Sequence, residues 1–332
     1  MKKLLIILLI PILIYFGVYS YKKYTEYQLF FTLRSDIENT NISVKYIDIY
    51  KDLYNKNFDE VINIISKHRS LSKDFFDTEK NEESLKKLYS IYENEEFKKV
   101  YNIVLDEFKN TSDIQQELTY AFKTIKFYYP SFNIKEVYFI VTGLGDSWYI
   151  NDDIIVIGLD SFLGDKCQWA PRLPKYLLDT YNRKNISAKI IHEVLNRYIK
   201  IDKSNNTLIS KVLDYGRLAS CTKLALPKVS DECVLEMTKN NFDFLEKNID
   251  HIWSFFVEND LLYNQECNTI RTYVGVGPFT RQLGEGYPGN VGGYLGYKII
   301  KKYVLSNSVN FRDLLEDFDS NKIFNSSNFN FM

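Results

Sequence analysis

The segment His192-Glu193-Val194-Leu195-Asn196 is the nearest approach of this chain to a known catalytic pattern. In the H-E-x-x-H pattern of zinc peptidases, two histidines four residues apart bind the metal from one helix face, and the glutamate activates a water molecule. Here Asn196 takes the place of the second histidine, and a neutral carboxamide is a poor zinc ligand. The sequence therefore predicts no bound metal and no cofactor. His192 and Glu193 remain the catalytic candidates of an alternative hypothesis.

Helical periodicity around this segment places His192 away from the core. The apolar stripe of the expected helix consists of Ile190, Ile191, Val194, Leu195 and Tyr198. At about 100° per residue, His192 and Asn196 lie well off this stripe. They share their side of the helix with Lys189 and Lys200. We therefore expect that side to face solvent.

Other residue types that could do chemistry are few. The chain has three histidines. His68 lies in the basic run Lys67–Arg69 and is expected in solvent, whereas His251 is expected to pack on an aromatic helix. Asp160 and Asp165 could serve as acid and base or bind a cation, but capping and structural roles are expected. No G-x-S-x-G nucleophile motif and no P-loop occurs in the sequence.

A glycine-rich stretch, residues 281–290, leads into an expected helix that carries Gly292 and Gly296. Glycines four residues apart flatten one side of a helix and let another element approach closely, so packing is the expected role. The polar-tipped side chains beside this stretch are candidates for a binding cleft. They are Arg281, Glu285, Tyr294 and Tyr297.

The elements that must position these residues form an α+β pattern. Helical periodicity covers residues 24–130, with Ser112 and Gln115 as an expected capping box. Residues 136–141 and 153–157 are rich in β-branched and aromatic side chains and flank a turn, which predicts a small antiparallel sheet of two or three strands. Helical periodicity returns after residue 187.

The N-terminus is expected to lie outside the folded domain. Residues 4–21 are almost wholly apolar and have two lysines on each side. A run of about 18 residues is just long enough to span a bilayer, and the same layout fits an export signal. An uncleaved membrane anchor is favoured over a cleaved signal peptide, and the flanking charges do not decide the orientation.

Composition and cysteines narrow the function classes. Hydrophobic residues make up 45% of the 332-residue chain, and the net charge is -1. This near-neutral charge argues against a nucleic-acid partner. Free buried thiols are favoured for the four cysteines, although one or two disulfides stay open for an exported domain. These cysteines are Cys167, Cys221, Cys233 and Cys267.

Several blocks of the second half occur in the order of a known family. They are Phe127–Pro130, Ile157–Asp165, Leu173–Tyr176, Trp253–Tyr263, Pro278–Thr280, Tyr287–Ile300 and Ile323–Phe329. Together these blocks resemble the gliding-motility-associated lipoprotein family called GldB, which is found in Bacteroidetes and is distantly similar to zinc metallopeptidases. The resemblance covers roughly residues 110–329.

The resemblance implies a degenerate, zincin-like domain, exported and held in the cell envelope outside the cytoplasm. In related peptidases a glutamate on the following helix is the third zinc ligand, and Tyr215 stands at that place here. A lipoprotein needs a cysteine just after its apolar run, but the first is Cys167, so a transmembrane segment is expected instead. The expected division is residues 1–23 as signal or anchor, residues 24–110 as an N-terminal helical region, and residues 111–332 as the GldB-like domain.

Three functions stay open at this stage. The first is a non-catalytic envelope protein that takes part in gliding motility by binding an envelope or motility protein. The second is a divergent zinc peptidase that uses His192 and Glu193. The third is an envelope scaffold unrelated to motility.

Overall fold

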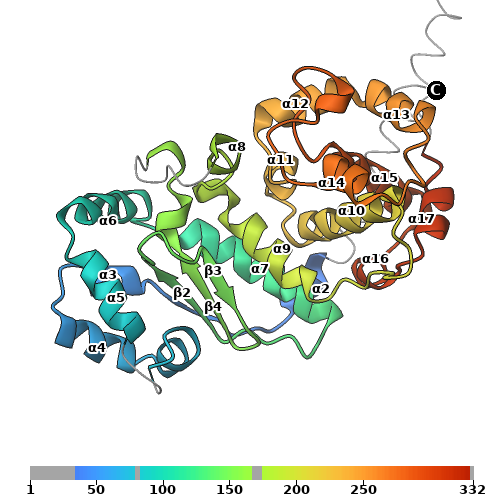
Figure 1. Ribbon diagram of the computed structural model, residues 1–332. Coiled ribbons are helices and arrows are strands. Elements are labelled where there is room, and N and C mark those ends of the chain that lie inside the picture. The colour runs from blue at the N-terminus through green and yellow to red at the C-terminus, as the bar shows by residue number, and fades with distance from the viewer. Residues whose placement is uncertain (1–33, 79–82, 167–173, 330–332) are drawn as a thin grey trace, which may run out of the picture.

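The computed structural model describes residues 34–78, 83–166 and 174–329, so the expected membrane segment at residues 4–21 lies outside the described part. Within those ranges, no helix is long and apolar enough to cross a membrane. Figure 1 shows the helices of residues 49–107 on one side of the sheet, those of residues 112–128 and 186–196 beside the sheet, and those of residues 208–327 gathered on the far side. The fold is a helix-rich α+β domain, as predicted.

The sheet has four strands in the described chain, in the order β1-β2-β4-β3. The strands are β1 (Lys45–Ile47), β2 (Glu136–Ile140), β3 (Trp148–Ile150) and β4 (Ile154–Gly158). The β1–β2 and β2–β4 pairs are parallel, and only β3–β4 is antiparallel. The expected antiparallel sheet was therefore wrong, because the sheet is mixed.

The reason for this difference lies in β4. Its residues Ile154–Gly158 are all buried, and a continuous apolar run is typical of a central strand with parallel neighbours. The side chain of Asn151 accepts hydrogen bonds from the backbone N–H groups of Asp153 and Ile154, at 2.8 and 2.7 Å. This tight turn sends β4 back between β2 and β3, so strands that are neighbours in sequence are not all neighbours in the sheet.

The N-terminal elements pack around this sheet. Their helices are α2 (Arg34–Asn39), α3 (Ile49–Leu53), α4 (Phe58–Ser66), α5 (Glu83–Tyr92), α6 (Glu95–Glu107) and α7 (Ser112–Tyr128), with a π-helical turn at Leu71–Phe75. The region expected to be wholly helical thus contributes one strand, β1. The capping box expected at Ser112 was wrong: Thr111 is the N-cap of α7, and the Gln115 amide donates to its hydroxyl at 2.9 Å.

The rest of the described chain is helical. Its helices are α8 (Lys175–Leu178), α9 (Ile186–Asn196), α10 (Leu208–Ala225), α11 (Asp231–Val234), α12 (Lys239–Lys247), α13 (Ile249–Glu258), α14 (Cys267–Val274), α15 (Val291–Asn307), α16 (Phe311–Glu316) and α17 (Ser320–Ser327). Short 3-10 turns occupy Leu159–Phe162, Gly164–Lys166, Arg183–Asn185 and Arg281–Leu283. One hydrophobic core runs through all of these layers.

Helices α10 and α15 cross at glycines. A Cβ atom added to Gly216 would lie 2.3 Å from the backbone of Gly296, and one added to Gly296 would lie 1.9 Å from the carbonyl oxygen of Val212. Neither distance leaves room for a side chain. The packing role expected for Gly296 is therefore confirmed, and α15 is held against α10 at backbone contact.

A buried guanidinium joins three C-terminal segments. Arg217 on α10 is 1% exposed and donates to the carbonyl oxygens of Lys200 and Asp317, at 2.7 and 2.6 Å. It also pairs with Asp214 at 2.7 Å. A buried charge is tolerated only when it is paired and hydrogen-bonded, and these acceptors come from the chain after α9, from α10 and from the end of α16.

The cysteines in the described chain are unpaired. Cys221 and Cys233 are buried and Cys267 is exposed, and all three are free thiols. Burial raises the pKa of the Cys221 thiol, which keeps it protonated and unreactive. Cys167 lies outside the described residues.

Candidate functional site

Helix α9 carries the His-Glu segment and is covered on more sides than its periodicity predicted. Its apolar residues, including Ile190 and Leu195, are buried, as expected. Asn196 and Lys200 are exposed, but Lys189 is only 2% exposed. The expectation that this polar side faces solvent was therefore wrong for its first half. Residues Tyr181, Tyr215 and Glu236 contact it.

Lys189 forms the centre of this covered side. Its ammonium lies 2.6 Å from a carboxylate oxygen of Glu236 and 4.4 Å from the ring centre of Tyr181. Glu236 follows α11 and has a φ of 53°, a left-handed conformation that costs energy for a residue with a side chain. A buried ammonium held by one carboxylate and one aromatic face is a satisfied cation.

His192 lies one turn after Lys189 on the same face. Its Nδ1 atom is enclosed by protein and has no hydrogen-bond partner in the described chain. Burial lowers the pKa of His192; Glu236 partly opposes this shift and Lys189 adds to it. The imidazole is therefore neutral at physiological pH.

Glu193 is next to His192 and is half-buried. Burial raises the pKa of its carboxyl and Glu236 raises it further, while Lys189 opposes the shift. Glu193 forms no hydrogen bond or ion pair with any described residue. Lys189, His192, Glu193 and Glu236 are called the His192 cluster below.

Tyr215 faces His192 from α10. The two ring centres are 6.0 Å apart, and the Tyr215 hydroxyl donates to the carbonyl oxygen of Leu235 at 3.3 Å. Burial raises the pKa of Tyr215, so its hydroxyl keeps its proton. The residue at the expected third-ligand position thus contacts His192 through its ring, and its oxygen bonds to the backbone.

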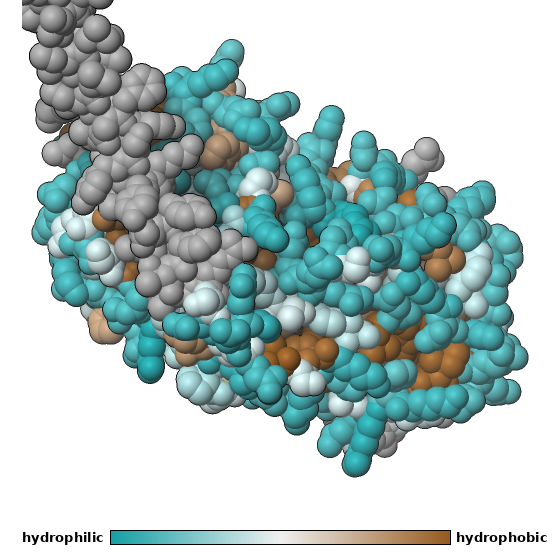
Figure 2. All heavy atoms as spheres, turned by 180° about the vertical axis from the view of Figure 1, so that it is seen from behind, coloured by the Kyte–Doolittle hydropathy of each residue, from teal (hydrophilic) through white to brown (hydrophobic). Residues whose placement is uncertain are grey.

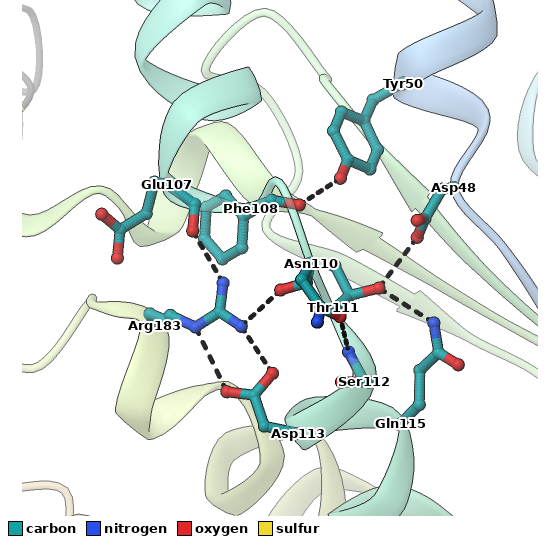
Figure 3. Close-up of polar contacts among 10 residues, drawn as sticks. All are labelled: Asp48, Tyr50, Glu107, Phe108, Asn110, Thr111, Ser112, Asp113, Gln115 and Arg183. Carbon is teal, nitrogen blue, oxygen red and sulfur yellow. Dashed lines mark hydrogen bonds and ion pairs between the residues drawn. The ribbon is translucent and has the colours of Figure 1, made fainter.

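Arg183 fixes the chain that leads into α9 (Figure 3). Its guanidinium donates to the carbonyl oxygens of Glu107 and Asn110, both at 2.7 Å. It also forms a two-pronged ion pair with Asp113 at the start of α7. Thr111 extends the network by donating to Asp48 at 3.0 Å. The start of α9 is therefore tied to the end of α6 and the start of α7.

The four cleft candidates near the glycine-rich stretch separate into two pairs. Arg281 and Glu285 are exposed, whereas Tyr294 and Tyr297 are buried in α15. The Tyr294 hydroxyl donates to Glu246 at 2.8 Å, and that carboxylate also pairs with Lys298. The four side chains therefore do not share one exposed face.

The loop between α14 and α15 is tightly held. A Cβ atom added to Gly289 would lie 2.1 Å from the carbonyl oxygen of Gly277, and Thr280 bonds to the backbone of Tyr287 and Pro288, both at 2.8 Å. Two large apolar side chains of this loop are exposed, Val276 at 69% and Phe279 at 59%.

The face seen from behind in Figure 2 is mostly hydrophilic, with its largest apolar areas in the lower half.

The remaining sequence candidates have structural roles. Asp160 is buried and accepts from the backbone of Thr142 at 2.8 Å and of Leu144 at 2.5 Å. It therefore fixes the turn after β2, a structural role as expected, but it does not cap the helix that follows. His68 is partly buried, with its ring edge against Tyr138, rather than free in solvent. His251 packs on Tyr287 and bonds to its hydroxyl at 2.7 Å.

The same geometry bears on metal binding. Among the residues that the structure describes, no group of three or more His, Cys, Asp and Glu side chains could hold a metal ion. A histidine that binds a metal usually donates its other ring N–H to a carbonyl or carboxylate, and the enclosed Nδ1 of His192 has no such partner. The donors present therefore do not fit a zinc ion.

Comparison with known proteins identifies the family. The model of the gliding motility protein GldB family matches residues 32–331. The chain belongs to this GldB family. Membership associates it with gliding motility, and the lipoprotein character of the family suggests a membrane-associated location in the cell envelope. No curated protein and no solved structure matches the chain.

Within this GldB family member, the sequence pattern located His192, Glu193 and Tyr215 but missed Lys189 and Glu236 as parts of one cluster. The signal that could have identified Lys189 is its spacing, since it precedes His192 by three residues and Glu193 by four and so shares their face. Glu236 belongs to a different element, and its contact with α9 has no signal in the sequence.

Proposed function

We propose that the chain acts in gliding motility as a non-catalytic envelope protein, with a peptidase-like domain that works by binding another envelope or motility protein. The family match supports the motility role. The proposed tether is the apolar run at residues 4–21, with the folded domain outside the cytoplasm. We also propose the region boundaries that the sequence predicts, with the anchor ending at residue 23 and the N-terminal helical region ending at residue 110.

The observation that carries the non-catalytic part is the buried Lys189 ammonium beside His192, 2.6 Å from Glu236. A hydrolytic zinc site concentrates two positive charges among histidines and carboxylates. Here the positive charge belongs to the chain itself and is already paired with the nearest carboxylate. A divalent ion beside His192 would be repelled by it.

The peptidase-like ancestry rests on how α9 and α10 face each other. His192 and Glu193 occupy the metal-binding helix of the implied pattern, and Tyr215 on the next helix faces His192 at 6.0 Å. In the zincin pattern that the sequence resemblance implies, Asn196 and Tyr215 take two of the three ligand positions.

A divergent zinc peptidase is the second candidate function. His192 and Glu193 favour it, because they occupy the first metal-ligand position and the general-base position of the H-E-x-x-H pattern. The raised pKa of Glu193 also suits a general base. An envelope scaffold unrelated to motility is disfavoured by the family match.

The test has a cellular part and a biochemical part. Deletion of the gene should abolish spreading on a surface, and both the wild-type gene and a His192→Ala, Glu193→Ala variant should restore it. Purified full-length protein in detergent should contain less than one zinc per chain and leave casein intact. Chelator-sensitive cleavage of casein, lost in the double variant, would establish the peptidase instead.

A further inference from the structure

The loop between α14 and α15 displays two large apolar side chains close together. Val276 is 69% exposed and Phe279 is 59% exposed, which makes them two of the three most exposed large hydrophobic residues in the described chain. Pro278 lies between them and is also exposed. Single apolar residues are common on protein surfaces, but neighbouring ones mark contact sites. Val276, Pro278 and Phe279 are called the apolar tip below.

The backbone holds the apolar tip outward. A Cβ atom added to Gly289 would lie 2.1 Å from the carbonyl oxygen of Gly277, so the two arms of the loop are in backbone contact. Directly after the tip, the buried Thr280 donates its backbone N–H to Tyr287 and its hydroxyl to Pro288, both at 2.8 Å. The loop is thus fixed inside and after the tip, and the described chain leaves the apolar side chains open.

The sequence around the tip carries charge of one sign. Residues 267–284 contain two arginines and no aspartate or glutamate. Arg281 follows the tip by two residues, and the side chain of Arg271 lies against Gly275, just before the tip. Both arginines are exposed, and neither side chain forms an ion pair with a residue that the structure describes. The one carboxylate of the loop, Glu285, lies on its other arm.

We propose that the apolar tip inserts into the headgroup region of a lipid bilayer, where Arg271 and Arg281 pair with lipid phosphates. Apolar and aromatic side chains bind at the boundary between headgroups and acyl chains, and cations beside them are attracted to anionic lipids. This inference rests on the membrane tether of the proposed function and adds a second contact between the folded domain and the membrane.

The proposed tether keeps the domain close to the bilayer. Twelve residues, 22–33, separate the apolar run at residues 4–21 from Arg34, the first described residue. A chain of this length spans at most about 40 Å, less than the diameter of about 50 Å expected for a 300-residue domain. The tip therefore meets lipid at a high effective concentration, so a small apolar contact is sufficient.

A protein partner fits these observations less well than a membrane. A specific protein interface covers about 800 Å² on each partner, whereas the apolar tip offers only two large side chains. A bilayer requires no matching shape, and it accepts an apolar group flanked by cations wherever the two meet. The size and charge of the tip therefore favour lipid.

The experiment places a fluorescent reporter at the tip of the full-length protein. Phe279→Trp is reconstituted in vesicles of phosphatidylglycerol and a phosphatidylcholine brominated on its acyl chains, because bromine quenches an indole that enters the bilayer. The introduced indole should lose most of its emission relative to vesicles without bromine, and its emission should shift to shorter wavelength. Phe127→Trp, at a 36% exposed site on α7, is the matched control and should show neither change. Wild-type protein supplies the signal of the native tryptophans, which is subtracted.

A second variant tests the charges. Arg281→Gln, combined with Phe279→Trp, should reduce the quenching in vesicles that contain phosphatidylglycerol and leave it unchanged in vesicles of the brominated phosphatidylcholine alone. Equal quenching with and without Arg281 in the anionic vesicles would refute the pairing with lipid phosphates. Circular dichroism checks that each variant is folded, and Val276→Trp is a second reporter of the same tip.

Two results would overturn the membrane contact. They are unquenched emission from both tip reporters, which is also the result expected if a protein covers the tip, and equal quenching of the Phe127→Trp control. Flotation of the wild type with the vesicles tests the tether separately. Protein that does not float refutes the tether and this inference together, whereas floating protein with unquenched tip reporters refutes the tip contact alone and leaves the motility and casein results untouched.

Discussion

The imidazole of His192 and the phenol ring of Tyr215 lie 6.0 Å apart on neighbouring helices, α9 and α10. The resemblance to zinc peptidases implies that residues at these two positions would be joined through a zinc ion. Here the rings contact each other, the Tyr215 hydroxyl bonds to the backbone of Leu235, and the cation of the site is Lys189. The His192 cluster therefore differs from the zinc site of a peptidase in its charge as well as in its ligands.

Restoring the sequence motif should not restore the metal. Asn196→His completes H-E-x-x-H, but Asn196 is exposed while Lys189 stays buried beside His192. We expect less than one zinc per chain after dialysis, measured by elemental analysis, in both the wild type and the variant. Tight, chelator-reversible binding of one zinc by Asn196→His would contradict the charge argument.

Removal of the buried ammonium should destabilise the protein. Lys189→Ala leaves Glu236 without its partner and opens space under Tyr181, with an expected loss of about 2–4 kcal/mol, since Glu236 is partly exposed. Denaturant unfolding measures the change. Lys239→Ala, which breaks an exposed pair with Asp243, is the control, with about 0–1 kcal/mol expected. Equal losses of unfolding free energy in the two variants would show that the Lys189–Glu236 pair stabilises the protein no more than an exposed ion pair does.

The α10–α15 crossing should not tolerate a methyl group. Gly216→Ala and Gly296→Ala would each place a Cβ within 2.3 Å or less of backbone atoms, and we expect a loss of about 1–3 kcal/mol or more. Gly277→Ala is the matched control, because nothing lies within 4 Å of its added Cβ. Thermal unfolding compares the three. A Gly296→Ala melting temperature equal to that of Gly277→Ala would refute the close crossing.

His192 should make stability fall on acidification. Its pKa is depressed below the ordinary 6.5 by burial, so below 6.5 the unfolded chain binds more protons than the folded one. The neutral His192 imidazole contributes fully to stability above pH 6.5, and this contribution is lost as the pH falls toward its depressed pKa. Glu193 and Asp160 have raised pKa values and contribute with the opposite sign.

The measurement is the free energy of unfolding at about pH 7.5 and about pH 5.5 in wild type and His192→Gln. The free energy of unfolding should fall more between these two pH values in the wild type than in the variant, because the variant lacks the imidazole. A pH dependence that is identical in both proteins would mean that His192 titrates as it does in the unfolded chain.

Arg183 should be irreplaceable by lysine. The guanidinium bonds to Glu107, Asn110 and Asp113 at once, whereas an ammonium cannot reproduce this planar geometry. Arg183→Lys should cost about 1–3 kcal/mol, and Arg197→Lys, at an exposed pair with Asp152, much less. Indistinguishable unfolding curves for the two variants would count against the network in Figure 3.

Local patterns predicted most of the helical regions and the positions of β2 and β4, but they missed β1. Helical periodicity was predicted across residues 24–130, and within that region Val100 and Val104 lie on the buried face of α6, because a 3.6-residue period is set by the helix itself. Strand pairing was not predictable in this way. The position of β4 between β2 and β3 depends on the path of the chain through space, and only its continuous apolar run indicated a central strand.

The candidate site shows the same limit. The apolar stripe of α9 was predicted correctly, but a helix that is covered on two sides has no single solvent face. Burial of Lys189 depends on Glu236, which lies 47 residues away in sequence, and on the Tyr181 ring. Such long-range pairing of charges leaves no periodic signal, so a lysine in a helix is taken for a surface residue.

The Arg217 guanidinium couples the local unfolding of segments that are far apart in the chain. Because its donors are used by carbonyl oxygens near the ends of α9 and α16, neither segment can fray without stranding a charge in the interior. The C-terminal helices and the middle of the chain should thus exchange their amide hydrogens as one cooperative unit. A truncation before Asp317 would disturb the His192 helix, although that helix lies more than a hundred residues earlier in the chain.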